Sequence, residues 1–180
     1  MRLFHVSEDG NIERFVPRPP TRTDLDPNTG LVWALCERTL PNFLTPRDAP
    51  RVCFHAHERT PPSLVERLFS FPDRPYVVAV EAAWLERLRR VKLYLYEFSP
   101  EGFALQDESA GYYVSTKTQT PLARWEVDDC LQALAQRRVE LRVLPGLWPL
   151  CHQIQALGGA LHWSMCRMQN ALPPDRKSVV

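Results

Sequence analysis

Two polar residues lie inside the first apolar segment of the chain, LFHVS, where His5 and Ser7 are separated by one residue. Alternate residues of a strand point to the same face, so His5 and Ser7 are expected to share a face. Imidazole and hydroxyl groups both donate and accept hydrogen bonds, which suits them to a hydroxyl-rich ligand. The alternative is a histidine at the edge of the core that makes local hydrogen bonds.

Arginines cluster in the segment TPRDAPR, which contains Arg47, Asp48 and Arg51. A guanidinium group can bind phosphate through two parallel hydrogen bonds, so Arg47 and Arg51 could clamp a phosphate. Asp48 could instead pair with either arginine and stabilise the turn. Arg14 and Arg18 lie on the long loop after the first strand, which could close over an anion.

Acids and aromatic residues meet in the segment QDESAGYYVS. Tyr112 and Tyr113 are expected to face opposite ways on a strand, so one packs in the core and the other can stack on a planar ring. Asp107 or Glu108 could then bind a ribose hydroxyl or stabilise a cation. The alternative is a hairpin turn with one exposed tyrosine.

Other polar residues have simpler interpretations. His55 and His57 in FHAHE could begin a metal site, but no third ligand stands at a specific spacing, so we expect a solvated strand end and no metal. Arg167 and Asn170 lie in an apolar stretch and either brace the fold from the C-terminus or line a site. The glycine-rich phosphate-binding, dinucleotide-binding, serine-hydrolase and zinc-protease motifs are absent from the sequence.

The composition indicates a globular domain. Apolar residues make up 44% of the 180 residues, and the formal net charge is +1, which argues against a broad nucleic-acid surface. No apolar run reaches the length of a membrane span, and the first residues lack a signal pattern, so we expect a soluble cytoplasmic protein without a membrane partner. The five cysteines are widely spaced, which favours buried thiols over disulfides or zinc.

Short strands outnumber helices in the periodicity of the sequence, and the strands are often consecutive. No strand–helix–strand rhythm and no repeat is present, which predicts an α+β fold with a mixed, mostly antiparallel sheet or split sandwich and packed helices. Residues 7–30 are expected to form a long loop, LHWSMCRM is either a strand or a helix, and the last residues are expected to fray. Because no linker divides the chain, we predict one domain over residues 1–180, with a C-terminal extension over about 126–180.

The segments HVSE, IERFVPR, LVWAL, TPRDAPRV, AGYYVS and CRMQNA together resemble a small bacterial family whose function is unknown. The order of elements also resembles the ADP-ribosyltransferase fold, especially the small type that modifies rifamycin antibiotics. That similarity is carried by FHVS at the first strand, LVWALCERTLPNFLTPRD, and KLYLYEFSPEGFALQDESAGYYVSTKTQTPL. It departs from the family in two places: no Gly-Thr pair follows the histidine, and Trp33 or Phe43 would replace a tyrosine.

The second resemblance implies that NAD is the substrate and lies in a cleft of a split sheet. It implies catalytic roles for His5, Tyr113, Asp107 and Glu108, with only one of the two acids in the cleft, and cofactor contacts from Ser7, Trp33, Arg47, Arg51 and Tyr112. The implied reaction is NAD-dependent ADP-ribosyl transfer or NAD hydrolysis, with an unknown acceptor.

Two alternatives stay open. The chain could be a non-catalytic module that binds a nucleotide or a small anion. It could instead be a protein-interaction domain, which would require an exposed apolar patch around Leu147, Trp148 and Leu150.

Overall fold

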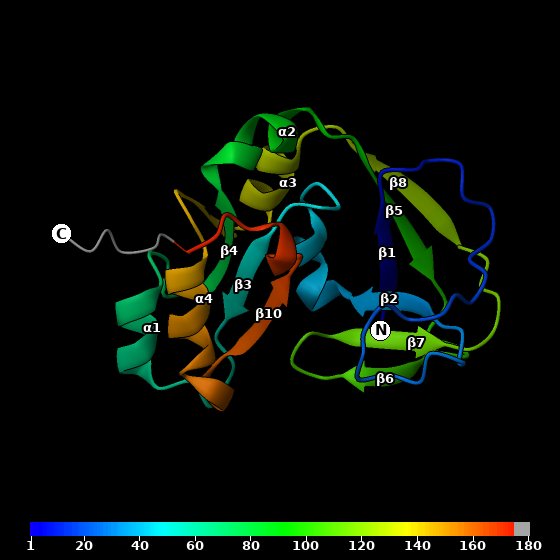
Figure 1. Ribbon diagram of the computed structural model, residues 1–180, viewed down its shortest axis with the longest axis horizontal. Coiled ribbons are helices and arrows are strands. Elements are labelled where there is room, and N and C mark those ends of the chain that lie inside the picture. The colour runs from blue at the N-terminus through cyan, green and yellow to red at the C-terminus, as the bar shows by residue number, and fades with distance from the viewer. Residues whose placement is uncertain (175–180) are drawn as a thin grey trace. The chain divides into compact units, whose positions relative to one another are not determined.

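The computed structural model describes residues 1–174, and the chain forms two compact units (Figure 1). Each unit is assembled from two separate segments. The first unit contains Met1–Phe43 and Lys92–Asp128, and the second contains Leu44–Val91 and the chain from Asp129 onward. The prediction of a single domain stays a prediction.

The first unit is built on a six-stranded sheet in the order β6-β7-β2-β1-β5-β8, and every neighbouring pair is antiparallel. Short strands rich in β-branched and aromatic residues are joined by polar turns, as expected for such a sheet. The strands are β1 (Leu3–Ser7), β2 (Val32–Cys36), β5 (Leu93–Phe98), β6 (Ala104–Asp107), β7 (Tyr112–Ser115) and β8 (Ala123–Val127), and the 3-10 helix η1 (Glu37–Phe43) follows β2.

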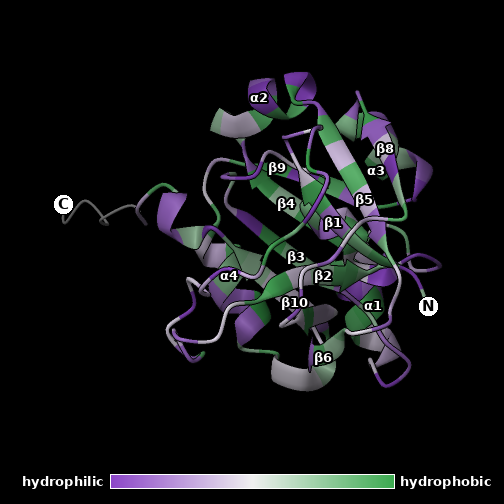
Figure 2. Ribbon diagram, turned by 90° about the vertical axis from the view of Figure 1, so that its right-hand side faces the viewer, coloured by the Kyte–Doolittle hydropathy of each residue, from purple (hydrophilic) through white to green (hydrophobic). Residues whose placement is uncertain are grey.

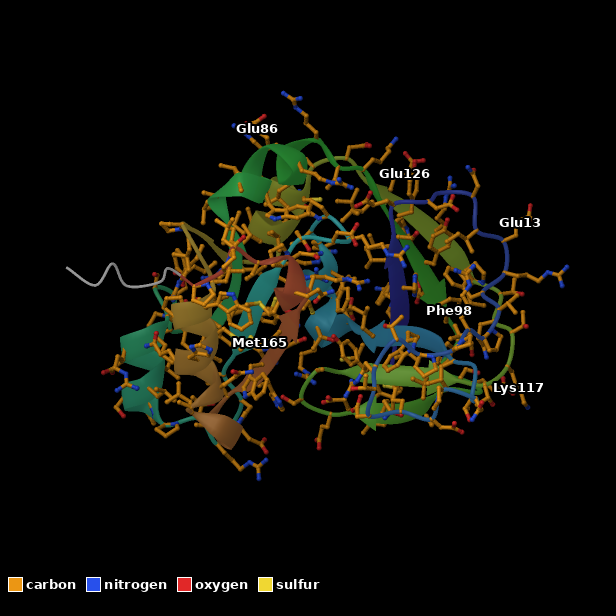
Figure 3. The ribbon with its side chains drawn as sticks, viewed as in Figure 1. Glu13, Glu86, Phe98, Lys117, Glu126 and Met165 are labelled. Atoms are coloured by element: carbon orange, nitrogen blue, oxygen red, sulfur yellow. The ribbon has the colours of Figure 1, made fainter. Side chains whose placement is uncertain are left out.

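One face of this sheet carries an apolar cluster. Leu3, Val32, Tyr96 and Phe98 pack there, and Phe15 from the long loop covers them. Phe98 is labelled at the end of β5 in Figure 3. The loop leaves the strand after residue 7, as predicted, and is tied down by isolated bridges from residue 15 to residue 119 and from residue 18 to residue 31.

The second unit is built on a four-stranded sheet in the order β10-β3-β4-β9. Its pairs are antiparallel except β4 with β9, which is parallel. The elements are β3 (Arg51–His55), α1 (Pro62–Leu68), β4 (Tyr76–Glu81), η2 (Ala82–Trp84), α2 (Leu85–Arg90), α3 (Cys130–Gln136), β9 (Glu140–Leu144), α4 (Trp148–Gln155), η3 (Gly158–Ala160), β10 (His162–Cys166) and η4 (Met168–Asn170).

Helices α1 and α4 cover one face of this sheet (Figure 1). The cluster contains Leu64 and Leu68 of α1, Leu147 and Ile154 of α4, and Phe54 of β3. Helix α2 carries the sequence LERLRR and is largely hydrophilic (Figure 2), and only Leu88 in it is buried.

The fold confirms the predicted α+β class with mostly antiparallel sheets. The segment LHWSMCRM contains a strand, β10, and not a helix. Asn170 braces the end of the chain, because its amide donates a 2.8 Å hydrogen bond to the Asp48 carbonyl. The segment LPPDRKSVV, residues 172–180, was expected to fray, but the Leu172 N–H donates a 3.0 Å hydrogen bond to the Glu81 carboxylate. Residues 175–180 of this segment lie outside the described residues.

Candidate functional site

The register of the six-stranded sheet divides the predicted site residues between its two faces. His5 pairs with Tyr96, and Tyr113 pairs with Ala34. Because directly paired residues point to the same face, His5, Ser7 and Tyr113 lie on the face that carries the apolar cluster. Trp33 and Tyr112 lie on the opposite face.

His5 links β1 to β2. The two strands pair only at Leu3 with Cys36 and at Phe4 with Leu35. Beyond these pairs, His5 Nδ1 lies 2.9 Å from the Trp33 carbonyl oxygen, and a carbonyl only accepts, so Nδ1 carries the proton. The His5 ring also packs 4.8 Å from the Phe15 ring. The His5 imidazole therefore links β1 to β2 beyond the point where the backbone hydrogen bonds between these strands end.

Ser7 and Tyr113 make structural contacts. Ser7 Oγ accepts a 3.0 Å hydrogen bond from the backbone N–H of Asp9, which fixes the turn after β1. The Tyr113 ring packs against the apolar cluster. Of the two tyrosines, Tyr113 is thus the one that packs against the core, and the predicted opposition of the pair is confirmed.

The opposite face carries three half-buried aromatic residues, Trp33, Phe43 and Tyr112, which we call the aromatic cluster. The Tyr112 ring lies 5.8 Å from the Trp33 ring and 6.0 Å from the Phe43 ring, both edge to face. Edge-to-face contacts hold aromatic rings in fixed orientations. Trp33 and Phe43, the two residues that could replace the family's tyrosine, therefore both contact Tyr112.

Asp107 lies beside the aromatic cluster, because it pairs with Tyr112 across the β6–β7 hairpin. Asp107 Oδ1 accepts a 2.9 Å hydrogen bond from the N–H of Ala110, which caps the turn and uses one of the two carboxylate oxygens. The Glu108 side chain is exposed, and its backbone carbonyl accepts a 2.6 Å hydrogen bond from Arg38. Asp107 is thus the carboxylate nearer to Tyr112 along the sheet.

The same hairpin depends on a glycine. Gly111 has φ +67°, and a Cβ at this position would lie 2.5 Å from Thr39 Oγ1 and 2.6 Å from Cys36 Sγ. Only glycine combines the left-handed backbone with that close approach. The turn thereby brings the Gly111 backbone directly against Cys36 at the end of β2 and Thr39 of η1.

Arg22, on the long loop, interacts electrostatically with this region, and its own charge is balanced by an acid. It forms a two-bond ion pair with Asp24 at 2.9 Å and 2.6 Å. This hydrogen-bonded pair is the main reason that the pKa of Arg22 is raised, and the charges of Asp107 and Tyr112 contribute less. A long polar loop therefore places a guanidinium group within electrostatic reach of Asp107.

Arg47 and Arg51 belong to the other unit. Arg51 is buried, and its Nη1 donates a 2.8 Å hydrogen bond to the Ala49 carbonyl, while the Arg47 side chain is exposed. Neither arginine therefore belongs to the unit that contains the aromatic cluster.

The sequence reasoning singled out Arg51 and His55 but missed the group of polar residues to which they belong. One face of the four-stranded sheet carries polar side chains at alternate positions of β3 and β10, which pair directly across the strands. We call this set the polar row: Arg51, Cys53, His55, His162, Ser164 and Cys166. The signal was present in the alternation of RVCFH and HWSMC, in which every second residue is polar or a cysteine.

The expectation that His55 lies at a solvated strand end is wrong. His55 is buried, and its ring stacks on Tyr76 with centroids 4.5 Å apart and an interplanar angle of 3°. His57 lies after the strand, where Nε2 donates a 2.9 Å hydrogen bond to the Gly159 carbonyl. Residues 1–174 contain no group of three His, Cys, Asp or Glu side chains arranged to hold a metal ion.

Within residues 1–174 the five cysteines form no disulfide, and three of them are buried. Burial is the main cause of the raised pKa of Cys53, and the neighbouring Cys166 adds to it. Ser164 Oγ lies 3.4 Å from Cys166 Sγ. Cys53 is consequently an inert thiol, in the manner of buried cysteines generally.

The patch required for the interaction-domain alternative is not formed around α4. Leu147 is fully buried, and Trp148 and Leu150 pack against the core of the second unit. Within residues 1–174, no helix has both the length and the hydropathy to cross a membrane.

Comparison with known proteins gives a family and no function. No curated protein and no solved structure matches the chain. The model of one protein family, DUF6886, described as a family of unknown function, matches residues 4–171. This match spans nearly the whole chain, which therefore belongs to the DUF6886 family.

Proposed function

We propose that the six-stranded unit binds NAD at the aromatic cluster and that the chain transfers or hydrolyses the ADP-ribosyl group. The observation that carries the proposal is the juxtaposition of half-buried aromatic rings with the Asp107 carboxylate. Aromatic side chains stack on planar heterocycles, and each such contact is worth about 1–3 kcal/mol in nucleotide recognition. The nicotinamide ring is a planar heterocycle of this kind.

The chemistry follows from the charge that develops. When the bond between the ribose C1′ and the nicotinamide nitrogen breaks, nicotinamide leaves with the bonding electrons and the sugar carbon becomes cationic. A carboxylate held nearby stabilises that cation more than it stabilises the ground state. Water or an acceptor group then bonds to C1′ and releases a proton to the solvent. In this proposal Asp107 supplies the carboxylate.

His5 acts indirectly in this arrangement. Its ring lies on the opposite face of the sheet and is hydrogen-bonded to the Trp33 carbonyl. We assign it to positioning Trp33.

The test is a titration with NAD, ADP-ribose and nicotinamide, followed by thermal unfolding and by tryptophan fluorescence. A ligand at about 100 times its dissociation constant stabilises the folded state by about 2.7 kcal/mol. NAD should raise the melting temperature of wild type by several degrees and should lose this effect in Trp33→Leu. Release of nicotinamide, measured by chromatography, then tests catalysis. The absence of a shift with all three ligands would overturn the proposal.

A second candidate is non-catalytic nucleotide binding. It is favoured by the hydrogen bond from the Ala110 N–H to Asp107 Oδ1, which gives this carboxylate a structural task in the turn. Binding of NAD without release of nicotinamide would select this function.

A further inference from the structure

The two edges of the six-stranded sheet differ. At one edge, the pairing of β6 with β7 is interrupted by a bulge between Leu105 and Asp107. At the other edge, β8 pairs with β5 in a regular register over all five residues. Bulges blunt an edge strand against further pairing, and a regular edge strand remains able to pair. Among residues 1–174, β5 is the one strand that pairs with β8.

Strand β8 exposes a large apolar side chain. Trp125 is 43% exposed, and Leu122 just before the strand is 69% exposed. The inner side of the Trp125 ring is supported, because Phe4 lies 6.4 Å away and the Arg2 guanidinium lies 5.6 Å from the ring centre. Exposed tryptophan held by its neighbours in one orientation is a common feature of interaction surfaces.

The sequence of β8, ARWEV, is complementary to itself in antiparallel orientation. A two-fold axis through Trp125 places Ala123 opposite Val127 and Arg124 opposite Glu126, with Trp125 opposite its own copy. The odd-numbered residues share one face and are apolar, while Arg124 and Glu126 share the other. In this register, apolar residues of one copy therefore pair with apolar residues of the second copy, and Arg124 pairs with Glu126.

Other registers are less favourable. A two-fold axis through Arg124 would oppose two arginines, and one through Glu126 would oppose two glutamates. Directly opposed like charges destabilise a strand pair. Of these three registers, the charge pattern favours the axis through Trp125.

The charges are held near these positions. Arg124 lies 3.5 Å from Glu126 on the same strand, and Lys92 lies 2.9 Å from Glu126 and 3.1 Å from Asp128. The Arg124 and Glu126 side chains are 42% and 44% exposed. Glu126 is labelled on β8 in Figure 3. Arg124 also donates a hydrogen bond to the Gly10 carbonyl of its own chain, so both charges are held in place while their side chains stay partly exposed.

We propose that β8 pairs with β8 of a second copy of this chain around a two-fold axis at Trp125. The two six-stranded sheets then join edge to edge into one continuous sheet. A closed two-fold contact uses the same patch on both copies, which accounts for a strand that is complementary to itself.

The test uses charge reversal and rescue. Molar mass is measured by light scattering and by analytical ultracentrifugation from about 1 to about 200 µM chain, because dimerisation depends on concentration. Wild type should form a dimer. Arg124→Glu alone and Glu126→Arg alone should each raise the dissociation constant by about tenfold or more, since like charges then oppose one another.

Mixing the two charge-reversal variants provides the decisive experiment. An equimolar mixture of the Arg124→Glu chain and the Glu126→Arg chain restores opposite charges at both pairs, so it should form heterodimers. Glu101→Gln, an exposed change away from β8, is the control. Thermal melts and far-UV circular dichroism identify any variant that fails to fold. A monomeric wild type at 200 µM, or a dimer that neither reversal weakens, would overturn the proposal.

Discussion

Tyr112 and Tyr113 are neighbours in sequence and lie on opposite faces of the six-stranded sheet, with Tyr112 against Trp33 and Phe43 and Tyr113 against the apolar cluster. Neighbouring residues of the same type therefore serve as matched probes of the two faces. Any ligand at the aromatic cluster should distinguish them.

Tyr112→Leu should weaken NAD binding by about tenfold, because it removes the stacking ring and keeps an apolar side chain. Tyr113→Leu should lower the free energy of unfolding by about 1–3 kcal/mol and leave the NAD dissociation constant near the wild-type value. Isothermal titration calorimetry and urea unfolding of both variants check this. Equal losses of affinity in the two variants would contradict it.

Asp107→Asn should reduce nicotinamide release by about 100-fold or more and leave NAD binding nearly unchanged. The amide oxygen of asparagine can still accept the hydrogen bond from the Ala110 N–H, so the turn is retained and only the charge is lost. The rate of nicotinamide release, measured by chromatography for wild type and variant, tests this prediction. If Glu108→Gln, and not Asp107→Asn, reduced the rate of nicotinamide release, the catalytic carboxylate would be Glu108.

His5→Ala should destabilise the fold by about 1–2 kcal/mol, because it removes the hydrogen bond to the Trp33 carbonyl and the packing on Phe15. NAD binding should weaken through the displaced Trp33. Urea unfolding measures the loss of stability. A comparison of the tryptophan fluorescence of the variant with that of wild type tests whether Trp33 is displaced. His5→Asn, whose amide can donate to the same carbonyl, should recover part of the loss.

Glu140 makes the stability of the protein depend on pH. Its pKa lies below the ordinary 4.5: burial acts to raise it, but hydrogen bonds from Arg142 and from the Ser70 backbone and hydroxyl outweigh that effect. A lowered folded-state pKa stabilises the protein above the unfolded value, and this contribution disappears as the pH falls through the folded value.

Glu140→Gln should therefore lower the free energy of unfolding by about 1–3 kcal/mol at neutral pH. The difference between wild type and variant should shrink below about pH 4. Urea unfolding between pH 7 and pH 3 measures it. Glu66→Gln, an exposed change on α1, serves as the control, and a constant difference across this range would contradict the assignment.

Cys53 should resist alkylation by iodoacetamide in the folded protein at pH 8, because burial raises its thiol pKa. Cys36 and Cys166 are half-buried and should react faster. Peptide mass spectrometry after timed labelling checks the order. Rapid labelling of Cys53 under native conditions would contradict it.

Local patterns in the sequence were sufficient for the fold class and for the long loop after β1, but they left LHWSMCRM open between a strand and a helix. Strand alternation places His5 and Ser7 on one face and Tyr112 and Tyr113 on opposite faces, as predicted. The face of each tyrosine could not be assigned in advance, because it depends on the pairing of Tyr113 with Ala34. His55 was misjudged for a related reason: its burial depends on the chain around β3, which periodicity within β3 does not report.

The interleaved order of the two units sets the sequence in which they can be completed on the ribosome. All strands of the six-stranded sheet have been synthesised once residue 128 has been added. At that point β3 and β4 have only each other, because β9 and β10 are still to come. The apolar face formed by Val52, Phe54 and Ala79 also awaits α4. A nascent or truncated chain of that length would therefore carry one finished sheet and one two-stranded ribbon whose apolar face is covered by α1 without α4, a form that chaperones recognise.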